Sequence, residues 1–130
     1  MKMKGLSEYI VSRYRNAVEI GIGHFPDIAF DLLGRRVRVF ATDITQFRYE
    51  GLKVIVDDIT EPDIPVYQGS DLIYSIRPPM ELVPYMKRIA GKISADLVVK
   101  PLSSEYMDGQ LIRQGDTTFH IWNYSNNKYK

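Results

Sequence analysis

The chain has 130 residues, 45% of them hydrophobic and 25% charged, and a formal net charge of +1. These values fit one globular domain over residues 1–130, and the near-zero charge leaves no electrostatic footprint for nucleic acid. The absence of cysteine excludes disulfides, thiolate zinc sites and cysteine nucleophiles.

The termini and the apolar runs give no sign of a membrane partner. No apolar run approaches the ~20 residues of a membrane span, and the N-terminus lacks the apolar core of a signal peptide. We therefore expect a cytoplasmic protein. Its only two histidines, His24 and His120, lie far apart in the sequence, and we expect no metal site.

The N-terminal third predicts a βαβ unit. Apolar residues at helical spacing predict a helix over residues 6–15, within an N-terminal region 1–16, with Ser7 as a possible cap. Gly21 and Gly23 then separate a short apolar strand from a second helix, for which Pro26 suits the first turn. The elements expected after the first helix are a strand, a helix and a strand, at residues 17–20, 25 or 26 to 33, and 36–42.

The middle of the chain predicts three more strands and one helix, completing a core over residues 17–102. Proline and glycine interrupt residues 60–70, which argues for an irregular connection. Pro84 lies inside the helical pattern of residues 80–90, so this helix starts late or bends. The strands are expected at residues 53–56, 71–76 and 95–102.

The C-terminal part predicts an antiparallel hairpin over residues 110–124. Strand-like runs at 110–114 and 117–124 flank Gly115-Asp116, a typical hairpin turn. Alternation in the second run suits a sheet with one face more buried than the other. His120, Trp122 and Tyr124 form a row that belongs either to a core or dimer face or to a surface for base stacking.

The glycine turn and the acids that follow it point to a nucleotide site. Gly21 and Gly23 let the backbone turn sharply and let a ligand approach the peptide groups. Asp43 lies about 20 residues further on, where a carboxylate can accept both hydroxyls of a ribose. Asp57 and Asp58 close the next strand. In open α/β sheets the carboxyl ends of the strands form the ligand-binding edge.

Glu19 favours a particular nucleotide. The position two before the first glycine is usually apolar in dinucleotide-binding strands, whereas here it carries a carboxylate. Negative charge matches a pyrophosphate poorly and suits the ammonium and sulfonium groups of S-adenosylmethionine. The alternative is a buried carboxylate that caps neighbouring backbone N–H groups.

The Glu-Ile-Gly-Ile-Gly run resembles the first motif of class I S-adenosylmethionine-dependent methyltransferases. That resemblance implies an α/β, Rossmann-like three-layer sandwich, with a mostly parallel sheet and a C-terminal antiparallel hairpin. It also implies that Gly21 and Gly23 line the methionine portion and that Asp43 holds the ribose. Further cofactor-binding candidates are Ile44 against the adenine, Asp58 at the adenine amino group with Asp57 as its alternative, and Ser75 near the end of the fourth strand.

Further segments, Val-Asp-Asp-Ile-Thr-Glu-Pro and Ser-Ile-Arg-Pro-Pro-Met-Glu-Leu, resemble an uncharacterised archaeal protein family, UPF0146, whose fold is methyltransferase-like. Two departures from the methyltransferase pattern stand out. Phe25 replaces the third glycine. Arg77 stands before two prolines where amino-directed methyltransferases have asparagine or aspartate. Because arginine only donates hydrogen bonds, Arg77 is a candidate clamp for an anionic substrate group, or else it only positions its loop.

The leading hypothesis is thus an S-adenosylmethionine-binding, methyltransferase-like domain, truncated relative to full methyltransferases, with no assignable catalytic residue or methyl acceptor. One alternative is a non-catalytic regulatory module that binds NAD or another adenosine nucleotide. Another is a ligand-free interaction domain that forms a homodimer through the hairpin edge. His24 either contacts ligand or acts as a base, or has neither role.

Overall fold

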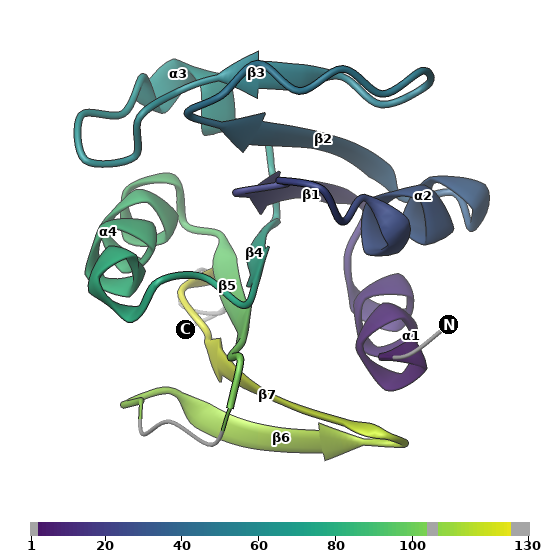
Figure 1. Cartoon of the computed structure of the whole chain (residues 1–130). Coiled ribbons are helices and arrows are strands. Elements are labelled where there is room, and N and C mark those ends of the chain that lie inside the picture. The colour runs from purple at the N-terminus through teal and green to yellow at the C-terminus, as the bar shows by residue number, and fades with distance from the viewer. Residues whose placement is uncertain (1–2, 104–106, 126–130) are drawn as a thin grey trace.

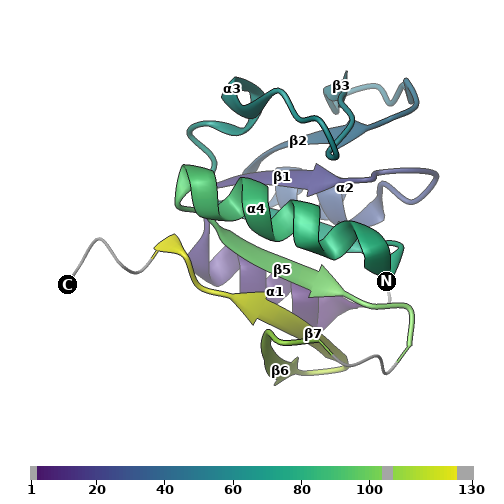
Figure 2. The same ribbon diagram turned by 90° about the vertical axis from the view of Figure 1, so that its left-hand side faces the viewer.

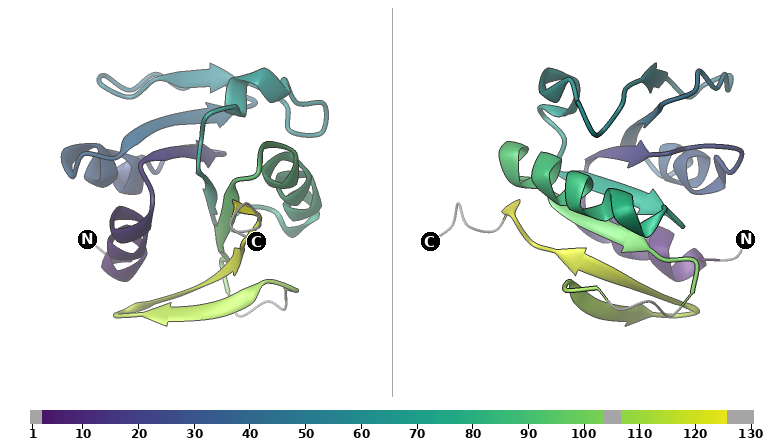
Figure 3. Two further views of the ribbon diagram at one scale, coloured as in Figure 1. Left: turned by 180° about the vertical axis from the view of Figure 1, so that it is seen from behind. Right: turned by 60° about the vertical axis from the view of Figure 1, so that its left-hand side comes forward.

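The computed structural model describes residues 3–103 and 107–125, and its strands form one seven-stranded sheet in the order β3-β2-β1-β4-β5-β7-β6. The first five strands are parallel, and β6 and β7 form an antiparallel hairpin. Figure 3 shows this hairpin at the opposite end of the sheet from β3. The strands are β1 (Asn16–Ile20), β2 (Arg38–Asp43), β3 (Val54–Val56), β4 (Leu72–Ile76), β5 (Asp96–Lys100), β6 (Gln110–Gln114) and β7 (Thr117–Trp122).

Helices cover both faces of the sheet, which confirms the expected Rossmann-like three-layer sandwich. On one side lie α1 (Lys4–Arg13) and α2 (Asp27–Gly34), and on the other lies α4 (Val83–Ile93) (Figure 1). Figure 2 shows α4 in front of the strands, with α1 and α2 behind them. The short α3 (Ile64–Tyr67) lies between β3 and β4 in the chain. In the part of the chain that the structure describes, no helix combines the length and apolar character needed to cross a bilayer.

The central strands are buried on both faces, which explains why their sequences are almost continuously apolar. Tyr74 and Val98 pack with α1 and α2, whereas Ile73 and Leu97 pack with α4. The alternation of side chains along each strand therefore fills two separate cores with one short run of residues. Because these strands are packed on both faces, their C-terminal ends are held in place at the carboxyl edge of the sheet.

Two local predictions were wrong. Ser7 does not cap α1: the helix begins at Lys4 after Met3, which has φ 65°, and the Ser7 side chain is buried inside the helix. The segment 60–70 is not wholly irregular, because Pro65 occupies the first turn of α3, where a missing N–H costs nothing. Pro84 likewise lies in the first turn of α4, after a 3₁₀ turn (Met80–Leu82), so the late helix start is confirmed.

The second strand of the hairpin has one face more buried than the other, as expected. Phe119 and Ile121 are 0% and 5% exposed, whereas Thr118 is exposed and His120 and Trp122 are each 9% exposed. Phe119 and Ile121 join the core beneath α1, while Trp122 joins the core beneath α4. The strand lies between β5 and β6, inside the sheet rather than at its edge. The position of Trp122 therefore supports a core role for the aromatic row.

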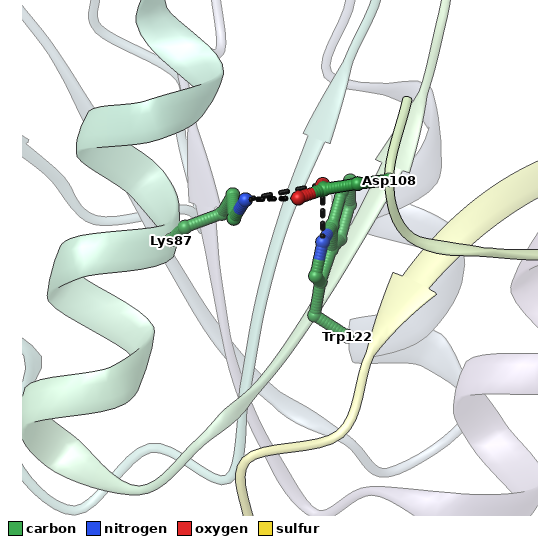
Figure 4. Close-up of polar contacts among 3 residues, drawn as sticks. All are labelled: Lys87, Asp108 and Trp122. Carbon is green, nitrogen blue, oxygen red and sulfur yellow. Dashed lines mark hydrogen bonds and ion pairs between the residues drawn. The ribbon is translucent and has the colours of Figure 1, made fainter. Parts of the chain in front are cut away.

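The fold lacks helices that a full methyltransferase sheet would carry. Residues 44–53, between β2 and β3, form a loop closed by a Tyr49–Leu52 bridge, and no helix occurs in residues 101–103 and 107–109. Asp108 instead fastens the β5–β6 connection: it accepts hydrogen bonds from Lys87 Nζ of α4 at 2.8 Å and from Trp122 Nε1 of β7 at 3.0 Å (Figure 4). A side-chain contact replaces the crossover helix at this position.

Candidate functional site

A cavity of about 500 Å³ opens at the carboxyl edge of β1, β2 and β3. Five residues proposed from the sequence line it: Gly21, Asp43, Ile44, Asp57 and Asp58. Six other lining residues were not predicted from the sequence: Ile20, Thr42, Ile59, Thr60, Pro79 and Leu82. Thr42 and Thr60 lie within two residues of a predicted acid, but Leu82 comes from the turn before α4 and only the three-dimensional packing brings it here.

Gly21 leaves the backbone of the glycine turn open to the cavity, whereas Gly23 does not line it. Gly21 has φ 76° and Gly23 has φ 52°, a backbone region that other residues rarely adopt. The Gly21 N–H donates to the Thr42 carbonyl oxygen at 2.8 Å, which joins the turn to the end of β2. A Cβ atom at Gly21 would meet no atom within 4 Å, so the space beside this peptide is empty of protein.

Asp43 holds the turn and faces the cavity at once. One carboxylate oxygen accepts the Gly23 N–H at 3.0 Å, and the other accepts the Thr45 N–H at 2.9 Å. A carboxylate offers about four lone-pair sites, so each oxygen keeps acceptor capacity for a ligand hydroxyl. The two backbone bonds fix the orientation of the Asp43 side chain beside Gly21 before any ligand arrives.

Asp57 and Asp58 have different surroundings. Asp57 accepts the Asp63 N–H at 3.0 Å and the Tyr67 hydroxyl at 2.6 Å, so both of its oxygens hold α3 in place. Asp58 is exposed and accepts the backbone N–H and the hydroxyl of Thr60 through a single oxygen. These bonds lower the pKa of Asp58, the backbone N–H more than the hydroxyl. Asp58 therefore keeps more free acceptor capacity than Asp57.

Part of the cavity lining is apolar. Ile44 is 70% exposed, an unusual position for a large aliphatic side chain, and it lies at the cavity with Ile59 and Leu82. Exposed apolar surface of this kind marks a place where a flat apolar group can be covered. The cavity thus combines an acidic floor with an aliphatic wall.

Glu19 lies beneath the turn and does not line the cavity. Its neighbours Val18 and Ile20 face α4, so alternation directs Glu19 to the α1–α2 side, where its register partner is Tyr74. The side chain is fully buried, and its carboxyl oxygens have no hydrogen-bond partner among the described residues. Burial raises the pKa of Glu19 to about 8, an effect that the nearby Tyr74 hydroxyl partly offsets.

A protonated Glu19 carries no charge near neutral pH, and this changes the electrostatic argument. Discrimination between a cation and a pyrophosphate now depends on Asp43, Asp57 and Asp58. No lysine, arginine or histidine is among the residues that line the cavity. Carboxylates without a basic partner match a cationic ligand better than a doubly charged pyrophosphate.

Ser75 and Arg77 lie outside the cavity lining as well. Ser75 is buried, and its hydroxyl donates to the Ile20 carbonyl oxygen at 2.8 Å, which fixes the strand just before the glycine turn. Arg77 is exposed, has φ 54°, and donates its backbone N–H to the Lys100 carbonyl oxygen at 2.6 Å. Its guanidinium lies 5.7 Å from the centre of the Phe25 ring.

The loop between β2 and β3 supports the glycine turn from the α2 side. The Tyr49 hydroxyl donates to the Gly23 carbonyl oxygen, and His24 packs edge-on against Phe47 with 4.9 Å between ring centres. His24 is exposed and does not line the cavity. Within residues 3–103 and 107–125, no group of three or more His, Asp or Glu side chains is placed to hold a metal ion.

Comparison with known families identifies relatives over almost the whole length. The family model described as "Uncharacterised protein family (UPF0146)" matches residues 3–123. The UPF0146 protein of Archaeoglobus fulgidus is 39% identical over 123 residues, covering 93% of this chain and 95% of that protein. The chain therefore belongs to the UPF0146 family.

Solved structures with a similar fold include methyltransferases. A putative S-adenosyl-L-methionine-dependent methyltransferase from Methanococcus maripaludis matches with a TM-score of 0.60 at 12% identity, covering 94% of this chain and 84% of that one. The MycE methyltransferase of the mycinamycin pathway, in complex with Mg and SAH, matches with a TM-score of 0.55 at 12% identity. That match covers 94% of this chain but only 45% of MycE. These similarities show the methyltransferase fold.

Proposed function

We propose that this chain binds S-adenosylmethionine at the carboxyl edge of β1, β2 and β3 and transfers its methyl group to an acceptor. One observation carries the proposal: within a sheet of methyltransferase strand order, the open peptide of Gly21 and the oriented carboxylate of Asp43 border the same cavity. The cavity volume of about 500 Å³ falls in the range typical of small-molecule sites.

Each part of the cofactor has a chemical counterpart. The ribose hydroxyls donate to the free lone pairs of Asp43, and the adenine ring covers Ile44. The adenine amino group donates to Asp58, whose second oxygen accepts no hydrogen bond from the described residues, whereas Asp57 is occupied by Asp63 and Tyr67. The methionine portion extends past Gly21 and Gly23.

Methyl transfer needs placement more than acid–base assistance. The lone pair of the acceptor attacks the methyl carbon, the carbon–sulfur bond breaks, and its electron pair stays on sulfur as the neutral thioether of S-adenosylhomocysteine. A protonated acceptor releases its proton to solvent. Because a sulfonium is a good leaving group, holding acceptor and methyl in line supplies most of the acceleration, and no catalytic residue is assigned.

Calorimetric titration with S-adenosylmethionine, S-adenosylhomocysteine and NAD tests the proposal. We expect binding heat with both methionine derivatives and none with NAD at the same concentration, because the cavity offers carboxylates and no basic group for a pyrophosphate. Heat with NAD alone would instead support the regulatory alternative. Absence of heat with both methionine derivatives would refute the proposal.

A further inference from the structure

Two departures from the methyltransferase sequence pattern meet in space. Phe25 stands where the third glycine of the turn belongs, and Arg77 stands where an amino-directed enzyme has asparagine or aspartate. They are 52 residues apart in the sequence, yet the Arg77 guanidinium lies 5.7 Å from the centre of the Phe25 ring. A cation held over an aromatic face is a specific arrangement, so the two replacements act as one unit.

From this contact we infer that the methyl acceptor is an anion, bound through its carboxylate or phosphate group by Arg77 on the Phe25 ring. The inference rests on the proposed function and names the class of its second substrate. The acceptor lies at the end of β4, the strand that pairs with β1, and Pro79 of the same segment lines the adenosine cavity. Arginine suits this role because its planar fork pairs bidentately with carboxylate and phosphate oxygens.

The backbone at Arg77 carries the signature of a functional position. Its φ of 54° is a conformation that residues with a Cβ rarely adopt, and Pro78 and Pro79 follow directly. A backbone hydrogen bond to Lys100 at 2.6 Å holds the strained residue at the end of the sheet. Strain of this kind persists where the surrounding structure enforces it, and it is concentrated at functional sites.

The charge of Arg77 is not neutralised by the protein. Arg35 and Lys87 are the only basic residues that form ion pairs in the part of the chain that the structure describes. Asp27, the nearest acid to Phe25 in the sequence, is exposed and makes no ion pair with Arg77. Lys100 adds a second cation at this end of the sheet, because its Cα is paired with that of Ile76. The edge therefore presents positive charge beside the turn and negative charge in the cavity.

The test follows anion binding to protein saturated with S-adenosylhomocysteine, which cannot transfer a methyl group. Inorganic phosphate and acetate are titrated separately into ¹⁵N-labelled protein, and NMR shifts are recorded for the Arg77 side chain and for the backbone amides of Arg77 and Lys100. The two anions distinguish a phosphate-bearing from a carboxylate-bearing acceptor. We expect saturable shifts at these resonances with one or both.

Three variants sharpen the result. Arg77→Asn removes the charge and tolerates the positive φ, so it should weaken anion binding about tenfold while S-adenosylhomocysteine affinity stays within about twofold. Phe25→Leu keeps an apolar side chain but removes the aromatic ring, and should weaken anion binding about threefold. Arg113→Gln removes an exposed arginine on β6, which lies three strands from β4 in the sheet, and should change neither affinity.

The outcomes separate this inference from the function it rests on. If S-adenosylhomocysteine binds but neither anion shifts Arg77, the anionic acceptor is wrong and the cofactor proposal stands. If Arg113→Gln weakens the anions as much as Arg77→Asn, the binding is non-specific and the inference is equally wrong. If S-adenosylhomocysteine does not bind, both proposals are refuted.

Discussion

Two groups of acids near the carboxyl edge have opposite surroundings. Asp43, Asp57 and Asp58 lie at or just after the ends of their strands, accept backbone hydrogen bonds and line a cavity. Glu19 lies inside β1, paired with Ala41 two residues before Asp43, and it is buried with no hydrogen-bond partner among the described residues. The difference teaches that an acid near a glycine turn is a ligand contact only if it lies at the end of its strand, where the side chain reaches the edge of the sheet.

The largest expected effect is on the pH dependence of the free energy of unfolding, and it comes from Glu19. Its folded-state pKa of about 8 exceeds the ordinary value of 4.5, so between these values the folded protein keeps a proton that the unfolded chain releases. The contribution of Glu19 to stability is therefore fully present below pH 4.5 and is lost as pH rises toward 8. The free energy of unfolding should drop by on the order of a few kcal/mol across this window.

Glu19→Gln should remove that pH dependence, because an amide does not titrate. Urea denaturation of both proteins at several pH values between 5 and 9 measures it, with the exposed Glu8→Gln as control. Parallel wild-type and Glu19→Gln stability curves would show that Glu19 is ionised in the folded protein, and the contrast between Glu19 and the cavity acids would fail.

The second effect comes from removing an acidic residue of the cavity. Asp43→Ala should lower the affinity for S-adenosylhomocysteine about 10- to 100-fold, since it removes charge-assisted hydrogen bonds to the ribose and frees the Gly23 N–H. Calorimetry measures the loss. Glu61→Ala, an exposed acid in the adjoining turn that does not line the cavity, is the matched control and should leave the affinity unchanged. Equal losses of affinity in both variants would show that Asp43 acts only through the overall negative charge of this region.

The third effect comes from filling the open space beside Gly21. Gly21→Ala places a Cβ beside the cavity and strains a residue with φ 76°, so S-adenosylhomocysteine affinity should fall about tenfold. Gly34→Ala is the control, since its Cβ also meets no atom within 4 Å but lies at the end of α2. Unchanged binding by Gly21→Ala would place the ligand elsewhere.

The smallest effect concerns the aliphatic wall. Ile44→Ser should weaken S-adenosylhomocysteine about threefold to tenfold, because the adenine then covers less apolar surface. Val56→Ser is a suitable control: Val56 is also half-exposed, at 50%, and lies outside the cavity lining. Fluorescence competition with an adenosine analogue is sensitive enough to measure the difference. Equal effects of the two substitutions would argue against adenine stacking on Ile44.

The sequence predicted the elements of the fold well because their signals are local. Periodicity and the positions of glycine and proline located the strands and the main helices, and Pro84 correctly indicated a late start for α4. The errors arose where tertiary contacts override local preference. The prolines of residues 60–70 suggest an irregular connection, but Pro65 fits the first turn of α3. Ser7 is a typical capping residue, but it is buried inside α1.

The site was predictable only in part, for the same reason. The acids that follow strands were identified because carboxyl ends of parallel strands meet at one edge. The orientation of Glu19 and the separate duties of Asp57 and Asp58 depend on which face each side chain occupies and on contacts from α3. Leu82 reaches the cavity from 39 residues beyond Asp43, and no local pattern reports such a contact.

The central claim is that an adenosine ligand occupies the cavity on the acidic side of the edge, and NMR mapping of S-adenosylhomocysteine binding tests it most directly. Backbone amide shifts should concentrate at Gly21, Ile44 and Thr60, which line the cavity, with little change in the β6–β7 hairpin at the far end of the sheet. Shifts confined to the hairpin, or no shifts at saturating ligand, would contradict the claim.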